Sequence, residues 1–167
     1  MAFGGLLILD ADALNRISES KLGSNFFLER KFKTTITPHS KEFGRLFPDI
    51  KSKTNVGLAS DAAKEFNISV LLKGANSVIA DNKKAWQLFG TDSQTARAGL
   101  GDLLSGLVAG SSAIDLAISK NITTEFFAKY VLLHSFAASK CKNGSNASAI
   151  GDELSKLMRN RKTRQIS

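Results

Sequence analysis

The stretch Leu6-Leu-Ile-Leu-Asp-Ala-Asp12 places four uncharged apolar residues directly before a short acidic segment. A short continuous apolar run is typical of a strand that is covered on both faces, and the polar residues indicate where that strand ends. Two later stretches repeat the pattern: Thr34–Thr37 leads into Pro38-His39, and Ile68–Leu72 leads into Lys73-Gly74. The sequence therefore predicts three buried strands, each followed by a polar loop.

Helical patterns separate these strands. Leu58, Ala62 and Phe66 recur at intervals of four residues, which favours an amphipathic helix over residues 55–67 with Asn55 as its cap. A further helix is predicted from Ala13 to Ser20, and another begins at a cap at Ser40 and ends at Leu46. Residues 23–33 are predicted to form a surface connection.

The second half of the chain changes character. Two short strands, Ser77–Ala80 and Ala85–Phe89, are joined by Asp81-Asn82 and are predicted to be antiparallel. Four helical segments are then expected, at residues 102–111, 113–119, 124–140 and 147–158. Alternating strands and helices predict an α/β layered fold with a largely parallel sheet, whose functional site lies at the carboxyl ends of the strands. The three polar loops are expected to meet at that rim.

Composition limits the function classes. With 167 residues, 43% of them hydrophobic, the chain has enough apolar material for one compact domain. A net charge of +8 permits anionic partners such as nucleotides, nucleic acid or an acidic membrane. A single cysteine, Cys141, excludes an intramolecular disulfide and a CxxC motif, which fits a cytoplasmic location. The apolar run Ala2–Leu9 is much shorter than the roughly 20 residues of a membrane helix, so no membrane association is expected.

The segment from Thr95 to Gly110 carries the clearest chemical signal. Gly99 and Gly101 permit a tight turn, and an apolar helical pattern begins directly after them. The first amides of a helix have no internal acceptors and lie at the positive end of its dipole, so they favour a phosphate group. Asp102 at this helix start is placed to take a proton from a hydroxyl that is being phosphorylated. The simpler alternative makes Asp102 an N-cap and the glycines a tight turn.

A Gly-x-Gly-Asp sequence that opens a helix resembles that of the ribokinase-like kinases. Within that superfamily the chain more closely resembles the ADP- or ATP-dependent NAD(P)H-hydrate dehydratases, which belong to the repair system for nicotinamide nucleotides. Four blocks in the same order carry the resemblance: Leu9-Asp-Ala-Asp-Ala-Leu-Asn15, Ile36-Thr-Pro-His-Ser-Lys-Glu-Phe-Gly-Arg-Leu46, Val70-Leu-Leu-Lys-Gly-Ala-Asn-Ser-Val-Ile-Ala80 and Ala96-Arg-Ala-Gly-Leu-Gly-Asp-Leu-Leu-Ser-Gly106.

The resemblance implies a ribokinase-like fold and a specific reaction. The ring hydroxyl of the hydrated nicotinamide would be phosphorylated by ADP or ATP with Mg2+, and loss of phosphate would restore NADH or NADPH. Asp102 would be the base, and His39 and Asp102 would contact the hydrated nucleotide. The implied nucleotide-binding residues are Lys73, Gly74, Ala75, Asn76, Ser77, Gly99 and Gly101.

Several alternatives remain open from the sequence. His39 also fits an ordinary loop residue, and Lys73 fits the solvated end of a strand. The chain also fits a kinase for a vitamin precursor or sugar, or an inactive nucleotide-binding fragment. Cys141 reads as an incidental thiol, and His134 as a packed or surface residue of its helix.

Relative to the family pattern, the amino-terminal part of the sheet is missing. Residues 1–158 are therefore interpreted as the carboxyl-terminal part of the domain, and residues 159–167 as a basic tail. An exposed sheet edge favours a homo-oligomer or a complementing amino-terminal half. Nucleic-acid binding by the tail is not favoured, because no aromatic residues are interleaved with its charges.

Overall fold

The computed structural model describes residues 3–89, 99–119, 122–141 and 145–164. The chain divides into two compact units. Unit 1 comprises Met1–Gly90 and Thr123–Glu125, and unit 2 comprises Thr91–Ile122 and Phe126–Ser167. Each unit is described by itself.

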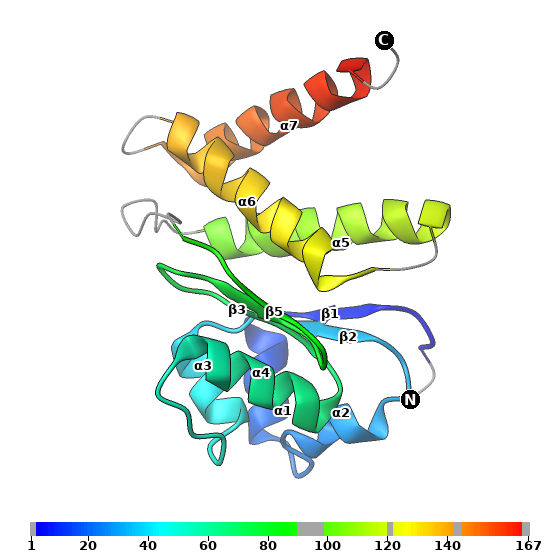
Figure 1. The fold of residues 1–167 in the computed structure, drawn as a ribbon, viewed down its shortest axis with the longest axis vertical. Coiled ribbons are helices and arrows are strands. Elements are labelled where there is room, and N and C mark those ends of the chain that lie inside the picture. Colours follow the sequence, from blue (N-terminus) through cyan, green and yellow to red (C-terminus); the bar gives the residue numbers. More distant parts are fainter. Residues whose placement is uncertain (1–2, 90–98, 120–121, 142–144, 165–167) are drawn as a thin grey trace. The chain divides into compact units, whose positions relative to one another are not determined.

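Unit 1 contains a five-stranded mixed sheet in the order β1-β2-β3-β4-β5 (Figure 1). The β1–β2 and β2–β3 pairs are parallel, whereas β3–β4 and β4–β5 are antiparallel. All five predicted strands are present, and the predicted antiparallel pairing of the last two is confirmed. The strands are β1 (Leu7–Leu9), β2 (Thr34–Ile36), β3 (Ser69–Leu72), β4 (Val78–Ala80) and β5 (Ala85–Gln87).

Four helices cover one face of this sheet (Figure 1). They are α1 (Asp12–Glu19), α2 (Asn25–Glu29), α3 (Ser40–Leu46) and α4 (Asn55–Phe66). Beneath them the Phe47 ring packs 5.0 Å from that of Phe43 and 4.9 Å from that of Phe66, measured between centroids. This aromatic cluster is part of the hydrophobic core that holds the parallel strands against the helices.

Three local predictions in unit 1 are corrected. The connection at residues 23–33 contains α2, because Phe27 is buried in the aromatic cluster and tertiary packing stabilises a helix too short to form alone. The cap of α4 is Thr54 rather than Asn55, since the Thr54 hydroxyl accepts from Gly57 N at 3.0 Å. The cap of α3 is His39 rather than Ser40.

Unit 2 is helical, with α5 (Leu100–Ser119), α7 (Ala147–Arg164) and all but the first two residues of α6 (Thr124–Lys140). The prediction of two separate helices at residues 102–111 and 113–119, divided by the turn-forming pair Gly110-Ser111, is wrong: α5 runs through both residues. A glycine inside a helix costs only about 1 kcal/mol, and Ser111 is buried, so packing outweighs the turn preference. The helix α7 also continues beyond Met158 to Arg164.

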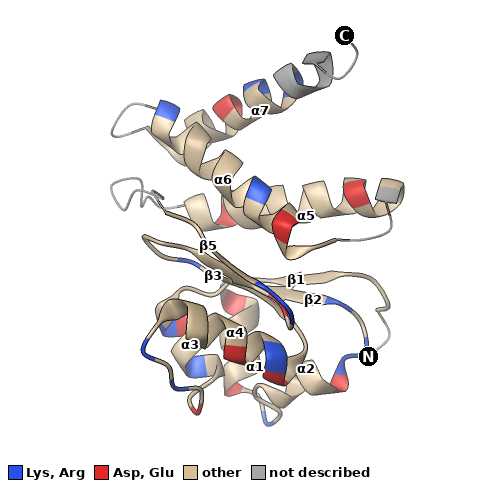
Figure 2. Ribbon diagram, in the orientation of Figure 1, with Lys and Arg blue, Asp and Glu red and all other residues tan. Residues whose placement is uncertain are grey.

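By length and composition alone, the segment Leu100–Ile118 of α5 is apolar enough to cross a membrane, with a mean hydropathy of 1.3. One such helix is weak evidence, because core helices of soluble proteins pass the same test. On the helices of unit 1, Lys and Arg lie beside Asp and Glu instead of forming a stripe of one sign (Figure 2).

Candidate active site

Polar side chains from three neighbouring strands meet at the carboxyl ends of the parallel strands. Asp10 follows β1, His39 follows β2 and Lys73 follows β3. The Lys73 backbone N–H donates to Pro38 O at 2.8 Å, and His39 and Lys73 form an isolated parallel bridge. The Lys73 ammonium lies 2.6 Å from Asp10 Oδ1. The predicted meeting of the polar loops is confirmed, and these three residues are called the strand-end cluster below.

The ion pair of the strand-end cluster is largely shielded from water. The side chains of Lys73 and Asp10 are 20% and 13% exposed. Asp10 Oδ1 also accepts from the Ala11 N–H at 2.9 Å. Ala11 itself has a φ of +48°, which residues other than glycine rarely adopt, so the chain turns sharply where Asp10 is held. Lys73 is therefore a fixed cation rather than a freely solvated end of a strand.

His39 is held by the start of α3. Its Nδ1 accepts from the backbone N–H groups of Lys41 and Glu42 at 3.1 and 3.3 Å. Glu42 returns the contact, with Oε2 accepting from His39 N at 2.8 Å and Oε1 lying 3.4 Å from Nε2. Because Nδ1 is an acceptor, a neutral His39 carries its proton on Nε2.

The orientation of His39 leaves its imidazole reachable. The side chain is 49% exposed, whereas that of Glu42 is only 7% exposed. Sequence reasoning did not single out Glu42. The available signal was its place three residues after the cap, where an acidic side chain completes a capping box.

The loop after β3 forms a tight turn. The Ser77 hydroxyl donates to Gly74 O at 3.1 Å and lies 3.3 Å from Gly74 N, which donates to it. Ser77 is buried by this arrangement, and Gly74, Ala75 and Asn76 are exposed. The turn therefore presents mainly backbone and the Asn76 amide to solvent.

In unit 2 the start of α5 has the geometry of an anion site. Gly99 has a φ of +83°, and its carbonyl accepts from Leu103 N at 3.0 Å. Gly101 lies in the first turn, and Asp102 is exposed there. The backbone amides of this turn have no intrahelical acceptors. Residues 96–98 of the sequence block that carries this glycine turn lie outside the described residues.

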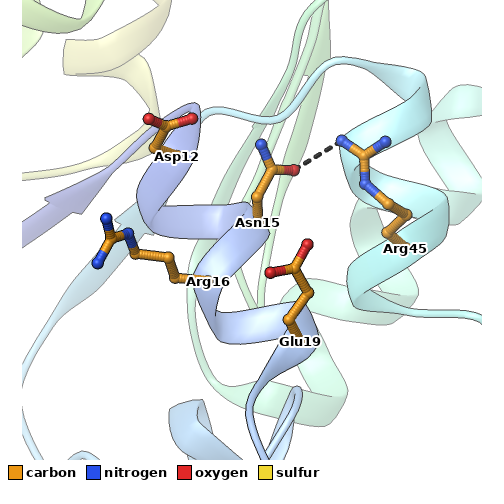
Figure 3. A pocket seen from close by; sticks show the side chains of 5 residues that line it. All are labelled: Asp12, Asn15, Arg16, Glu19 and Arg45. Atoms are coloured by element: carbon orange, nitrogen blue, oxygen red, sulfur yellow. Dashed lines mark hydrogen bonds between the residues drawn. The ribbon is translucent and has the colours of Figure 1, made fainter.

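A separate polar groove of about 420 Å³ lies between α1 and α3 (Figure 3). Arg45 Nη2 donates to Asn15 Oδ1 at 2.6 Å across it. The groove is lined by Asp12, Asn15, Arg16, Glu19 and Arg45. Asp12 thus lines this groove, and it is Asp10 that pairs with Lys73.

Magnesium has no site made of protein groups alone within the part of the chain that the structure describes. No three His, Cys, Asp or Glu side chains converge there. Mg2+ in phosphoryl-transfer enzymes is commonly held by one or two carboxylates together with substrate phosphates. The side chains of the described residues fit that arrangement only if a bound nucleotide supplies most of the magnesium ligands.

The fold of this chain is ribokinase-like. A solved ribokinase-like superfamily protein from Enterococcus faecalis matches 93% of this chain with a TM-score of 0.75 and 23% identity, over 52% of that protein. A second solved structure is the ADP/ATP-dependent NAD(P)H-hydrate dehydratase from Bacillus subtilis, co-crystallised with ATP and Mg2+. It matches with a TM-score of 0.70 and 22% identity, and the match covers 93% of this chain and 55% of the Bacillus subtilis chain. At these identities the likeness shows the fold.

The family follows from sequence. The model of the NAD(P)H-hydrate dehydratase family matches residues 2–160, and the chain belongs to that family. The bifunctional NAD(P)H-hydrate repair enzyme Nnr of Synechocystis is 41% identical over 105 residues, which are 62% of this chain and 20% of that protein. The chain thus spans about a fifth of this relative's length. The ribokinase-like fold and the family expected from the sequence are confirmed.

Proposed function

We propose that this chain takes part in the repair of hydrated nicotinamide nucleotides. A phosphoryl group passes from ADP or ATP to the ring hydroxyl of the S-epimer of hydrated NAD(P)H. Phosphate then leaves, the neighbouring ring carbon loses a proton so that the ring double bond re-forms, and NADH or NADPH is released with AMP or ADP. Family membership supports this reaction, and the observation that carries it is the start of α5, where an exposed carboxylate adjoins amides that have no intrahelical acceptors.

The proposal gives each site residue a role. Asp102 takes the proton from the ring hydroxyl as its oxygen attacks the phosphorus atom. His39 binds the hydrated nucleotide, with its ring held in one orientation by α3. Lys73 supplies positive charge to the phosphates of the cosubstrate, with Asp10 fixing its ammonium. Gly74, Ala75, Asn76 and Ser77 form a turn against the nucleotide, and Gly99 and Gly101 let its phosphates approach the amides of α5.

Mg2+ bound to the nucleotide phosphates would supply charge neutralisation during transfer. We propose a cytoplasmic location, where reduced nicotinamide nucleotides are used. We also propose assembly, because β1 lies at the edge of the sheet formed by the described strands, next to β2. Either a homo-oligomer or the amino-terminal portion of a dehydratase fold would then complete the enzyme. No nucleic-acid or membrane partner is proposed.

The test is an absorbance assay at the NADH band, with hydrated NADH, ADP or ATP, and Mg2+. The chain is assayed alone and together with the amino-terminal portion of a related dehydratase. Asp102→Asn is compared with Asp115→Asn, which removes a second carboxylate from the same helix 13 positions further along.

The expected result is NADH formation with release of phosphate, reduced about 100-fold or more in Asp102→Asn and little changed in Asp115→Asn. A stable phosphorylated product would instead indicate a kinase. No turnover by the folded protein under either condition would reject the proposed reaction for this chain.

A further inference from the structure

A buried carboxylate lies beside the imidazole of His39. The Glu42 side chain is 7% exposed, and both polar contacts of its carboxylate among the described residues are with His39. Oε2 accepts from His39 N at 2.8 Å, and Oε1 lies 3.4 Å from Nε2. Burying an ionised group is costly unless another group compensates for it, so a negative charge at this position requires a reason.

The capping box of α3 does not require this charge. In a capping box, the side chain three residues after the cap accepts a hydrogen bond from the backbone N–H of the cap, and glutamine serves there as well as glutamate. Glutamine at position 42 would therefore keep the bond to His39 N without burying a charge. The feature that only the glutamate provides is a negative charge beside Nε2 of His39.

The helix cap and the carboxylate favour the same tautomer of the His39 ring. Nδ1 accepts from the N–H groups of Lys41 and Glu42 at 3.1 and 3.3 Å, so this nitrogen must be unprotonated. The carboxylate attracts the ring proton to Nε2, which is the nearer nitrogen. Its distance of 3.4 Å exceeds the ordinary N–H···O range of about 2.7–3.2 Å, and the ring is 49% exposed. The Nε2 proton can therefore still be donated to a ligand.

We infer that Glu42 is a positioning residue, which keeps His39 in the Nε2–H tautomer so that the ring meets its ligand as a hydrogen-bond donor and selects an acceptor oxygen there. That this ligand is hydrated NAD(P)H rests on the proposed function. The tautomer itself does not, because it can be measured in the absence of any ligand.

The first measurement is the nitrogen-15 NMR spectrum of the histidine rings in the full chain without ligand, at pH 8.5, where imidazole is neutral. The chain has two histidines, and His39→Asn, which keeps a capping side chain, assigns the His39 signals. Glu42→Gln keeps the capping box and removes the charge, whereas Glu42→Asp keeps the charge. Thr54→Ala removes the cap of α4 and controls for loss of a helix cap in the same unit.

The wild-type His39 ring should carry its proton on Nε2. In Glu42→Gln its signals should move toward the average of the two tautomers, with those of His134 unchanged, although the protein unfolds at the same urea concentration as wild type or a higher one. Glu42→Asp should stay closer to wild type. In the turnover assay, Glu42→Gln should raise KM for hydrated NADH roughly two- to tenfold, as expected for one weakened hydrogen bond, with little change in kcat or in KM for ADP. Thr54→Ala should lower stability and leave the tautomer and KM unchanged.

A folded Glu42→Gln protein whose His39 ring keeps the wild-type tautomer would overturn the inference, and so would a wild-type ring with its proton on Nδ1. An equal change of KM in Thr54→Ala would do the same, since it would reduce Glu42 to a residue that only stabilises unit 1. If the tautomer responds as expected but the wild-type protein forms no NADH, the positioning stands and the proposed reaction fails.

Discussion

Removing either partner of the Asp10–Lys73 ion pair should destabilise unit 1 measurably. Asp10→Asn leaves a shielded ammonium without its carboxylate, and Lys73→Met leaves a shielded carboxylate while retaining most of the aliphatic stem. The two residues join the ends of β1 and β3 across β2, so the pair links strands that are not adjacent in the sheet.

The short distance and partial burial of the Asp10–Lys73 pair determine how large its coupling free energy should be. Unit charges 2.6 Å apart attract by about 6 kcal/mol at an effective dielectric constant of about 20, and desolvation offsets much of this. Exposed pairs contribute about 0–1 kcal/mol, whereas breaking a fully buried pair costs about 3–5 kcal/mol. With side chains 20% and 13% exposed, the pair should lie between these limits, at a coupling free energy of about 1–3 kcal/mol.

A double-mutant cycle isolates that coupling from the other effects of each substitution. Urea unfolding followed by fluorescence reports on unit 1, because Trp86 in β5 is the only tryptophan in the chain. The control cycle uses Lys84 and Glu125, which also lie in unit 1 but are 63% and 56% exposed at a distance of 3.2 Å. Its coupling should be below about 0.5 kcal/mol and should vanish in high salt.

The reasoning is refuted if the Asp10–Lys73 coupling is no larger than that of the control pair. It is also refuted if both couplings are screened equally by salt, since a shielded pair should retain most of its coupling.

Two further predictions concern the carboxyl group of Asp81 in unit 1 and the glycines of α5 in unit 2. Burial opposes ionisation of Asp81, but two backbone N–H groups, the Thr124 hydroxyl and a nearby lysine outweigh it and lower the Asp81 pKa below 3.8. The stabilisation that ionised Asp81 provides is therefore complete well above pH 3.8 and is lost as pH falls through the folded pKa. When the free energy of unfolding is followed by Trp86 fluorescence and plotted against pH, Asp81→Asn should reduce the loss of stability at acid pH. Gly99→Ala should destabilise unit 2 by about 1–2 kcal/mol, because φ is +83° and the new Cβ would lie 3.3 Å from that of Ala147. Gly106→Ala, in an open part of α5, should instead stabilise by about 0.5–1 kcal/mol in circular dichroism melts, and the opposite order would contradict this account.

Local sequence patterns were sufficient where one segment decides its own conformation. The charge-free runs identified β1 and β3, and the spacing of Leu58, Ala62 and Phe66 identified α4. These local patterns failed where contacts with residues distant in sequence determine the conformation of a segment. The helix α2 exists because Phe27 finds the rings of Phe47 and Phe66, and no pattern within residues 23–33 contains that information.

The sequence by itself determined the family, the strand–helix order and the expectation that three polar loops converge, because these depend on motif order and on the rule that parallel strands end at one edge. Only the tertiary structure decided which side chains then pair. Asp10 rather than Asp12 contacts Lys73, and Glu42 fixes the ring of His39. Such choices depend on ångström-scale distances between segments up to 63 positions apart, which the order of residues does not fix.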